Sequence, residues 1–559
     1  MAIDEENKGS DISVERKGDI SLGQEALSDP EDAGHSLHRG LQSRQVTMIA
    51  IGGAIGTGLI IGTGSALAKA GPGSLLIAYT FVGFIVFLVM AALGEMAAWL
   101  PAAGGFSVYA TRFVDPALGF ALGYTYWFKY IITTPNQLTA AALVIQFWLP
   151  ATKVNPGVFI AVFLVVIVAI NYIGIRFFGE FEFWLSSIKV LVIVGLILLA
   201  LILALGGGPD HDRKGFRYWK DPGAFAPYLA KGSLGQFLGF WSTMVNAVFA
   251  YLGTELVGVT VGEAENPRKT IPRAIKLTFY RILFFYCLSV LLLGMIIAYD
   301  DTELVKATKQ AYNSAAASPF VAAIRVSGIK VLPGFLNACI LIFVFSASNS
   351  DLYIASRTIH GLALKGHAPA FLAKTDHRGV PYYSLGISAA FCCLAFMNVT
   401  SDSKVVFGYF VNLVTIFGLL TWISILVSHI YFIRARNAQG VDPNTLAYRA
   451  PFGAAGTYFA LFWCILIALT KNFDVFVKGF NYKSFVTGYL GIPLYLIMIF
   501  GWKFIKGSEG VKAHTADIWT GKDVIDRDEE MWKRKEEEAR LSGVKDGSWF
   551  YKHFLAWLF

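Results

Sequence analysis

The chain has 559 residues, of which 55% are hydrophobic and 15% are charged, and its formal net charge is +8. This composition excludes a typical soluble protein, because soluble proteins carry more charge. The positive charge is typical of basic loops beside anionic lipid, and it does not indicate a nucleic-acid partner.

In chain order, the first predicted segment is a polar, acidic tail over residues 1–43, which we expect to be disordered. About twelve apolar runs follow, each of roughly the 20 residues that a helix needs to cross a bilayer. The predicted spans are 46–69, 74–98, 117–148, 156–175, 184–206, 236–262, 275–299, 331–362, 382–400, 405–433, 455–475 and 484–505. The sequence therefore predicts an all-α polytopic membrane protein with a transporter domain over residues 44–506.

Residues 507–559 form a charged tail, in which 526–541 is typical of a solvated surface helix and less typical of a dedicated partner site. An even number of spans places both tails on one side of the membrane. Loop charge does not say which side, because basic pairs such as Arg268 with Lys269 and Arg213 with Lys214 lie on opposite sets of loops.

The run IGGAIGTGLIIGTG at residues 51–64 places six glycines inside the first predicted span. A glycine costs about 1 kcal/mol in a helix interior relative to alanine. Bare backbone at membrane depth is tolerated where it lines a cavity or is buried in protein. Five spans later, LGTEL at 252–256 is the counterpart of IGTGL at 55–59, and such paired breaks indicate a transporter binding site. Close helix packing through small residues is the alternative interpretation.

Five longer runs carry a family resemblance. They are IGGAIGTGLIIGTGSALAKAGPGSLLIAY (51–79), GEMAAWLP (94–101), FVDPALGFALGYTYW (113–127), GEAENPRKTIPRAI (262–275) and SASNSDLYIASR (346–357). Over about residues 44–505 the chain resembles the fungal amino-acid permeases, the yeast amino-acid transporter family of the amino acid–polyamine–organocation superfamily. Three further runs resemble the dicarboxylic amino-acid permeases, which carry glutamate and aspartate: TPNQLTAAALVIQFWLP, FFGEFEFWLSSIKV and LGGGPDHDRKGFRYWKDPGAF.

The resemblance implies a LeuT-type 5+5 inverted repeat with broken helices 1 and 6. The first repeat would span 46–206 and the second 236–433, with two extra helices over 455–505. It also implies a plasma-membrane location, cytoplasmic termini and symport with a proton as the coupling ion, with no other cofactor and no metal.

The resemblance further implies that the α-carboxylate of the substrate sits on the backbone N–H groups of Gly56, Thr57 and Gly58. The exposed N-terminus of a half-helix is a ready anion site, and the Thr57 hydroxyl adds a donor. The α-ammonium would face carbonyl groups around Ala54.

In the sixth span, carbonyl groups around Phe249 and Ala250 would complete the ammonium site. Phe249 or Tyr251 is expected to form an aromatic lid over the substrate, although an aromatic residue on a span usually faces lipid or the core.

Ionisable residues inside spans are expensive, so each is a functional hypothesis. Lys129 and Gln137 lie eight residues apart on nearly one helix face, and Asn136 adjoins them. Relatives that take neutral amino acids carry Gln and Glu at the two places. Compared with those relatives, Lys129 adds a positive charge and Gln137 removes a negative one. Both differences favour an anionic substrate side chain. The alternative is that Lys129 snorkels to an interface.

Lys189 in the fifth span is the candidate proton carrier, because burial favours the neutral form of a lysine. Its alternative role is interfacial. Glu255 after the sixth-span break is expected to accept the proton or to order the break. Asp351 is interpreted as structural, capping a helix or pairing with Arg357.

The predicted function is proton-coupled import of acidic amino acids. A broad neutral amino-acid permease and, less favoured, a non-transporting amino-acid sensor are the alternatives. A membrane enzyme is disfavoured because the sequence shows no nucleophile–base–acid set and no metal cluster. The expected partners are the substrate, the lipid bilayer and ubiquitination machinery acting on Lys8 and Lys17, which are equally well explained as ordinary solvated lysines.

Overall fold

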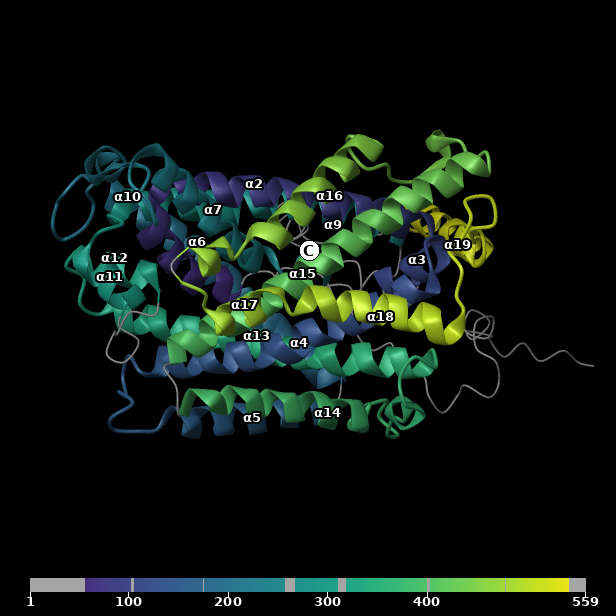
Figure 1. Ribbon diagram of the computed structural model, residues 1–559, viewed down its shortest axis with the longest axis horizontal. Helices are drawn as coiled ribbons and strands as arrows, with labels where there is room; N and C mark the ends of the chain where they lie inside the picture. Colours follow the sequence, from purple (N-terminus) through teal and green to yellow (C-terminus); the bar gives the residue numbers. More distant parts are fainter. Residues whose placement is uncertain are drawn as a thin grey trace, which may run out of the picture.

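The computed structural model describes residues 56–101, 105–173, 175–256, 267–309, 318–399, 403–477 and 479–541. The predicted N-terminal tail, with Lys8 and Lys17, lies outside these ranges. The regular elements of the described residues are helices. Helices α2, α4, α13 and α18 run along the longest axis of the molecule, and the long helix α15 crosses them obliquely (Figure 1).

The helices of the N-terminal half are η2 (Gly58–Gly62), α2 (Thr63–Trp99), α3 (Phe106–Phe113), α4 (Pro116–Ile145), α5 (Pro156–Ile173), α6 (Ile175–Ala204) and η3 (Trp219–Gly223). Those that follow are α7 (Gly232–Tyr251), α9 (Pro267–Arg281), η5 (Ile282–Leu288), α10 (Ser289–Ile296), α11 (Thr302–Lys309), α12 (Pro319–Val326), α13 (Leu332–Leu364), η6 (Ala370–Ala373), α14 (Tyr382–Cys392), η7 (Cys393–Val399) and α15 (Ser403–Ala438). The last are η8 (Pro443–Thr445), α16 (Gly453–Thr470), η9 (Phe473–Phe476), α17 (Tyr482–Tyr489), α18 (Gly491–Lys506) and α19 (Lys522–Leu541).

Seven of the described helices are long and apolar enough to cross a membrane, or eight if the bent pair α17 and α18 forms one span. This is fewer than the twelve predicted spans. Part of the difference comes from α2, which runs from the first predicted span into the second. Together with η2 it counts as one helix, Gly58–Trp99, where two spans were predicted. Helices α4 and α7 are not among the seven, because polar and glycine residues interrupt their apolar sequences.

A kink at Gly71 separates the two spans within α2. Its φ is 83°, a left-handed conformation that favours glycine. A Cβ atom there would also lie 2.7 Å from the carbonyl oxygen of Ala224. The loop before α7 closes on the kink through two backbone hydrogen bonds, from Gly73 to Ala224 (2.8 Å) and from Ala226 to Ala70 (2.9 Å). These bonds give partners to backbone groups at the kink, where the helical hydrogen-bond pattern is interrupted.

The outer surface of the bundle is apolar. Val165 on α5 is 68% exposed, Leu191 on α6 is 72% exposed and Phe504 on α18 is 92% exposed. Lys129 and Lys189, by contrast, are buried in the interior. Apolar side chains outside and charged ones inside are what a bilayer requires, so the described helices form a polytopic membrane protein.

The C-terminal segment after α18 folds back over one end of the bundle, next to α3 (Figure 1). The backbone N–H of Val511 donates to the carbonyl of Val114 at 2.8 Å. The indole of Trp99, the last residue of α2, donates to the carbonyl of Ile518 at 2.9 Å. The predicted surface helix at 526–541 is part of α19, which belongs to this segment.

Helix α19 is tied to the bundle through Arg268 near the start of α9, which forms ion pairs with Asp526 and Glu529. Hydrogen bonds from Lys533 and Arg268 hold the pKa of Glu529 below its usual value. At Asp526 burial favours the protonated form, but hydrogen bonds from Lys522 and Arg268 outweigh it and lower the pKa. The two carboxylates therefore stabilise this contact fully at pH values above the pKa of a free carboxyl group. The stabilisation is lost as the pH falls through the lowered pKa values of Asp526 and Glu529.

We expect amide hydrogen exchange across α19 to increase when the pH falls from about 7 to below about 4, after correction for the intrinsic rate. Arg268→Gln should produce the same increase at neutral pH. The matched control is Arg527→Gln, which breaks only the exposed ion pair with Asp523 on the same helix. Unchanged exchange in the Arg268→Gln variant would contradict this account of the contact.

Candidate functional site

The break predicted in the sixth span is present in the structure. Helix α7 ends at Tyr251, Leu252 is extended with φ −61° and ψ 140°, and Gly253 has a φ of 98°. On the first span the π-helix η2 begins at Gly58. Ala54 and the first half of that span lie outside the described residues. The described parts place the start of η2 directly against the end of α7.

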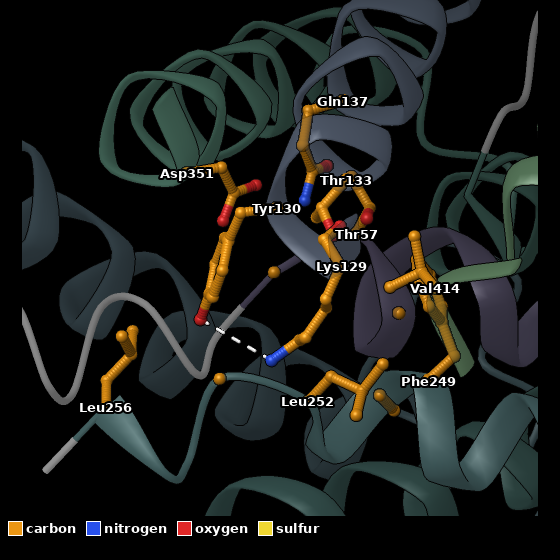
Figure 2. A pocket seen from close by; sticks show the side chains of 14 residues that line it. Thr57, Lys129, Tyr130, Thr133, Gln137, Phe249, Leu252, Leu256, Asp351 and Val414 are labelled. Atoms are coloured by element: carbon orange, nitrogen blue, oxygen red, sulfur yellow. Dashed lines mark hydrogen bonds between the residues drawn. The ribbon is translucent and has the colours of Figure 1, made fainter. Parts of the chain in front are cut away.

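A pocket lies beside these two helix ends (Figure 2). It contains about 420 Å³ of empty space, part of which is open to solvent. Its lining comes from η2, α4, α7, α13 and α15 and from the segments next to the helix ends. The lining residues are Gly56, Thr57, Gly58, Lys129, Tyr130, Thr133, Gln137, Phe249, Ala250, Leu252, Gly253, Leu256, Asp351 and Val414.

The glycines of the first span serve two purposes. At Gly58 a Cβ atom would lie 2.5 Å from Cα of Ala250, so this glycine lets two backbones approach. At Gly56 a Cβ atom would meet none of the described residues within 4 Å. Between them, Thr57 is buried, and its hydroxyl has no hydrogen-bond partner among the described residues. The packing interpretation therefore applies at Gly58, while Gly56 and Thr57 leave space and an unused hydroxyl beside the pocket.

The predicted cation, Lys129, forms an ion pair with Glu255. Lys129 is 1% exposed and Glu255 is 0% exposed, so the pair is buried and Lys129 does not snorkel to an interface. Lys129 Nζ also lies 3.4 Å from the hydroxyl of Tyr130 (Figure 2). Glu255 accepts hydrogen bonds from the backbone N–H of Gly253 (3.1 Å) and the indole of Trp422 (3.3 Å). Glu255 therefore both neutralises Lys129 and orders the break in the sixth span.

Gln137 and Lys129 line the same pocket, as their helical spacing predicts, and the side-chain oxygen of Gln137 has no partner among the described residues. Asn136 is buried beside them and is not among the lining residues. Asp351 lines the pocket, which sequence reasoning missed. Its expected partner Arg357 donates instead to the carbonyl of Gly379 at 3.1 Å.

Phe249 and Ala250 line the pocket, so the residues expected at the end of the sixth-span helix are in place. Tyr251 is not among the lining residues. Its hydroxyl donates to the carbonyl of Tyr79 at 2.9 Å, and its ring stacks on Tyr286 with centroids 4.4 Å apart. Tyr251 is therefore a packing residue in this structure, and Phe249 is the aromatic side chain that faces the pocket.

A second buried ion pair lies on α6, on the side that faces α13. Lys189 Nζ is 3.7 Å from Glu182, and both residues are 0% exposed. Glu182 also accepts hydrogen bonds from Ser186 at 3.3 Å and from Ser346 on α13. Sequence reasoning found Lys189 and missed Glu182. The seven-residue spacing that places both on one face of α6 was the available signal.

Comparison with known proteins agrees with this architecture. The amino acid permease family model matches residues 45–511. The chain is 56% identical over 540 residues to the dicarboxylic amino acid permease of Saccharomyces cerevisiae, covering 96% of this chain and 88% of the relative. It is 40% identical over 493 residues to the proline-specific permease of Emericella nidulans, covering 88% and 89%. It is 39% identical over 500 residues to the basic amino-acid permease of Saccharomyces cerevisiae, covering 88% and 86%. The chain therefore belongs to the amino acid permease family and is a multi-pass membrane transporter rather than an enzyme.

Proposed function

We propose that the chain imports the acidic amino acids L-glutamate and L-aspartate by symport with protons. The observation that carries the proposal is the buried lysine, Lys129, which lines the pocket at the end of α7 and the start of η2. The identity to a dicarboxylic amino acid permease, 56%, against 40% and 39% for the proline-specific and basic amino-acid permeases, supports the same substrate class.

We further propose twelve transmembrane helices in a LeuT-type 5+5 inverted repeat, with repeats over 46–206 and 236–433 and two extra helices over 455–505. The protein would lie in the plasma membrane with both tails cytoplasmic. The observed break after α7, together with the start of η2 beside it, supports this architecture, because paired interruptions in the two halves are typical of such transporters.

In this proposal the α-carboxylate of the substrate binds the backbone N–H groups of Gly56, Thr57 and Gly58. The open space at Gly56 and the unpartnered hydroxyl of Thr57 support the assignment. The α-ammonium would face carbonyl groups of Phe249 and Ala250 in the sixth span and of Ala54 in the first span. Phe249, which lines the pocket, is then the aromatic lid.

The second carboxylate of the substrate would bind near Lys129 and Gln137. A buried carboxylate needs a cation or several donors, since an unpaired buried charge is costly. Lys129 is held by Glu255 in the empty pocket, so the substrate would have to share or replace that partner. Lys189 and Glu255 are the proposed proton-coupling groups, and the fully buried Lys189–Glu182 pair supports a role for this region in moving charge.

The test is uptake of radiolabelled glutamate by cells that express the full chain and lack their own acidic amino-acid transport, at two external pH values. We expect faster uptake at the lower pH, and competition by aspartate but not by proline or lysine. Cells with the empty vector are the control. Absence of glutamate uptake, or equal competition by proline, would overturn the proposal.

A second candidate is a broad permease for neutral amino acids. One observation favours it, because Glu255 already neutralises the charge of Lys129. In that case unlabelled glutamine should compete with glutamate as well as aspartate does, in the same uptake assay.

A further inference from the structure

Among the described residues, one acidic group of the pocket, Asp351, forms no ion pair. Lys129 pairs with Glu255, and Lys189 pairs with Glu182. The carboxylate of Asp351 lines the pocket, and the described residues offer its Oδ2 atom no hydrogen-bond partner. Among the described residues, this buried region holds two lysines and three acids, so one acid has no cation of its own.

Asp351 lies between the two ion pairs. It is on α13, five residues after Ser346, which donates a hydrogen bond to Glu182. Five residues correspond to about 7.5 Å along a helix. On its pocket side, Figure 2 shows the Asp351 carboxylate beside Tyr130 and Gln137. The same acid therefore adjoins both the substrate pocket and the Lys189–Glu182 pair.

The groups that act on Asp351 come from each helix packed around it. Burial of the Asp351 carboxylate has the largest influence and disfavours its ionised form. Lys129 on α4, the amide of Gln137 and Lys189 on α6 favour the ionised form. Glu182 on α6 opposes ionisation. The remaining titratable neighbours are Tyr126 and Tyr130 on α4 and Cys392 on α14, which interact electrostatically with Asp351, and Glu255, which acts on the same two tyrosines.

An acidic amino acid brings a second carboxylate into this region. Two carboxylates that share a buried site cannot both stay ionised without a further cation, so one of them takes up a proton. The two lysines are already paired, and Asp351 is the acid without such a partner among the described residues.

We propose that Asp351 binds a proton from the solvent when an acidic substrate enters the pocket, and releases it when the substrate leaves. The proton forms an O–H bond to the Asp351 carboxylate, and no other bond changes. One proton thus accompanies one substrate anion through the buried site. This inference rests on the proposed transport of acidic amino acids. It adds Asp351, as the group that binds the proton, to the proposed coupling groups Lys189 and Glu255, which act on it through the two ion pairs.

The test compares binding of glutamate and glutamine to the purified full-length chain between about pH 5.5 and about pH 7.5, using wild type and Asp351→Asn. The asparagine mimics the protonated acid in shape. In wild type the affinity for glutamate should fall by about tenfold for each unit that the pH rises, over the range in which Asp351 is ionised in the empty pocket. In Asp351→Asn the glutamate affinity should be nearly independent of pH and should exceed that of wild type at the higher pH. Glutamine binding should change little with pH in either protein.

The matched control is Asp523→Asn, the same substitution at an exposed position on α19, which should keep the wild-type pH dependence. An unchanged pH dependence of glutamate binding in Asp351→Asn would overturn the proposal. An equal loss of glutamate and glutamine binding would also overturn it, because Asp351 would then be a ligand of the shared α-ammonium group.

Should Asp351→Asn fail to fold, proton uptake by wild type decides the question. Adding glutamate to the purified protein in weak buffer should take up about one proton per bound substrate, and glutamine should take up fewer. Equal proton uptake with both substrates would overturn the role of Asp351. Failure of the proposed function gives a different result, since wild type would then bind neither glutamate nor aspartate at any pH.

Discussion

Replacing Gly56 by leucine should abolish glutamate uptake while leaving the amount of folded protein at the cell surface close to that of wild type. Among the described residues, a Cβ atom at Gly56 would meet nothing within 4 Å, so the first side-chain atom has room there. The larger side chain would instead fill space beside the pocket that Gly56 lines. Uptake of labelled glutamate and surface abundance, measured on the same cells, check both parts of the prediction.

Two matched variants separate blocking of the pocket from damage to the fold. Gly195→Leu makes the same change at another glycine with open space around it, on the exposed side of α6, and should keep uptake normal. Gly58→Ala should lower the abundance of folded protein, because its Cβ atom would lie 2.5 Å from Cα of Ala250. Normal glutamate uptake by a well-expressed Gly56→Leu variant would show that this segment does not bind the substrate.

Thr57→Val is a smaller change that tests the same site. It keeps the shape of the side chain and removes the hydroxyl, which has no hydrogen-bond partner among the described residues. Uptake should fall strongly with no loss of surface protein.

The sequence was sufficient to predict the helices and the break because both depend on local signals. Long apolar runs determine the helices, and LGTEL at 252–256 marks the interruption that the structure places after Tyr251. The polar residues of helix α4 were equally informative. A lysine and a glutamine eight positions apart lie on nearly the same face of a helix, and in an apolar helix that face is expected to point inward. Lys129 and Gln137 both line the pocket.

The partner of Lys129 could not be predicted, because tertiary packing alone brings the two residues together. Lys129 and Glu255 are 126 positions apart, and nothing local to either residue identifies the other. The predicted pairing of Asp351 with Arg357 was wrong for the same reason, since Arg357 donates a hydrogen bond to the carbonyl of Gly379 instead. Tyr251 beside the break was expected to cover the substrate, but its ring packs away from the pocket.

Replacing Lys129 by glutamine should reduce both the stability of the protein and its uptake of acidic amino acids, and these effects need separating. Removing one member of a buried ion pair typically costs roughly 3–5 kcal/mol, because the other charge is left uncompensated. In Lys129→Gln that charge is Glu255, which is fully buried. We therefore expect lower abundance and a lower thermal unfolding temperature for this variant. Arg217→Gln, which breaks an exposed ion pair with Asp212, should leave both close to wild type.

The double variant Lys129→Gln/Glu255→Gln removes both charges and should recover most of the lost stability. It should not recover acidic selectivity, because the cation available to the second carboxylate of the substrate is still missing. Losing a buried charge-assisted contact costs roughly 2–5 kcal/mol, which corresponds to a fall of about 30-fold or more in glutamate affinity. Glutamine lacks that carboxylate, so its uptake should fall much less. Measuring glutamate and glutamine uptake in the double variant, normalised to surface protein, therefore isolates the contribution of Lys129. An equal loss for the two substrates would assign the lysine to packing or proton movement and would place acidic selectivity elsewhere in the pocket.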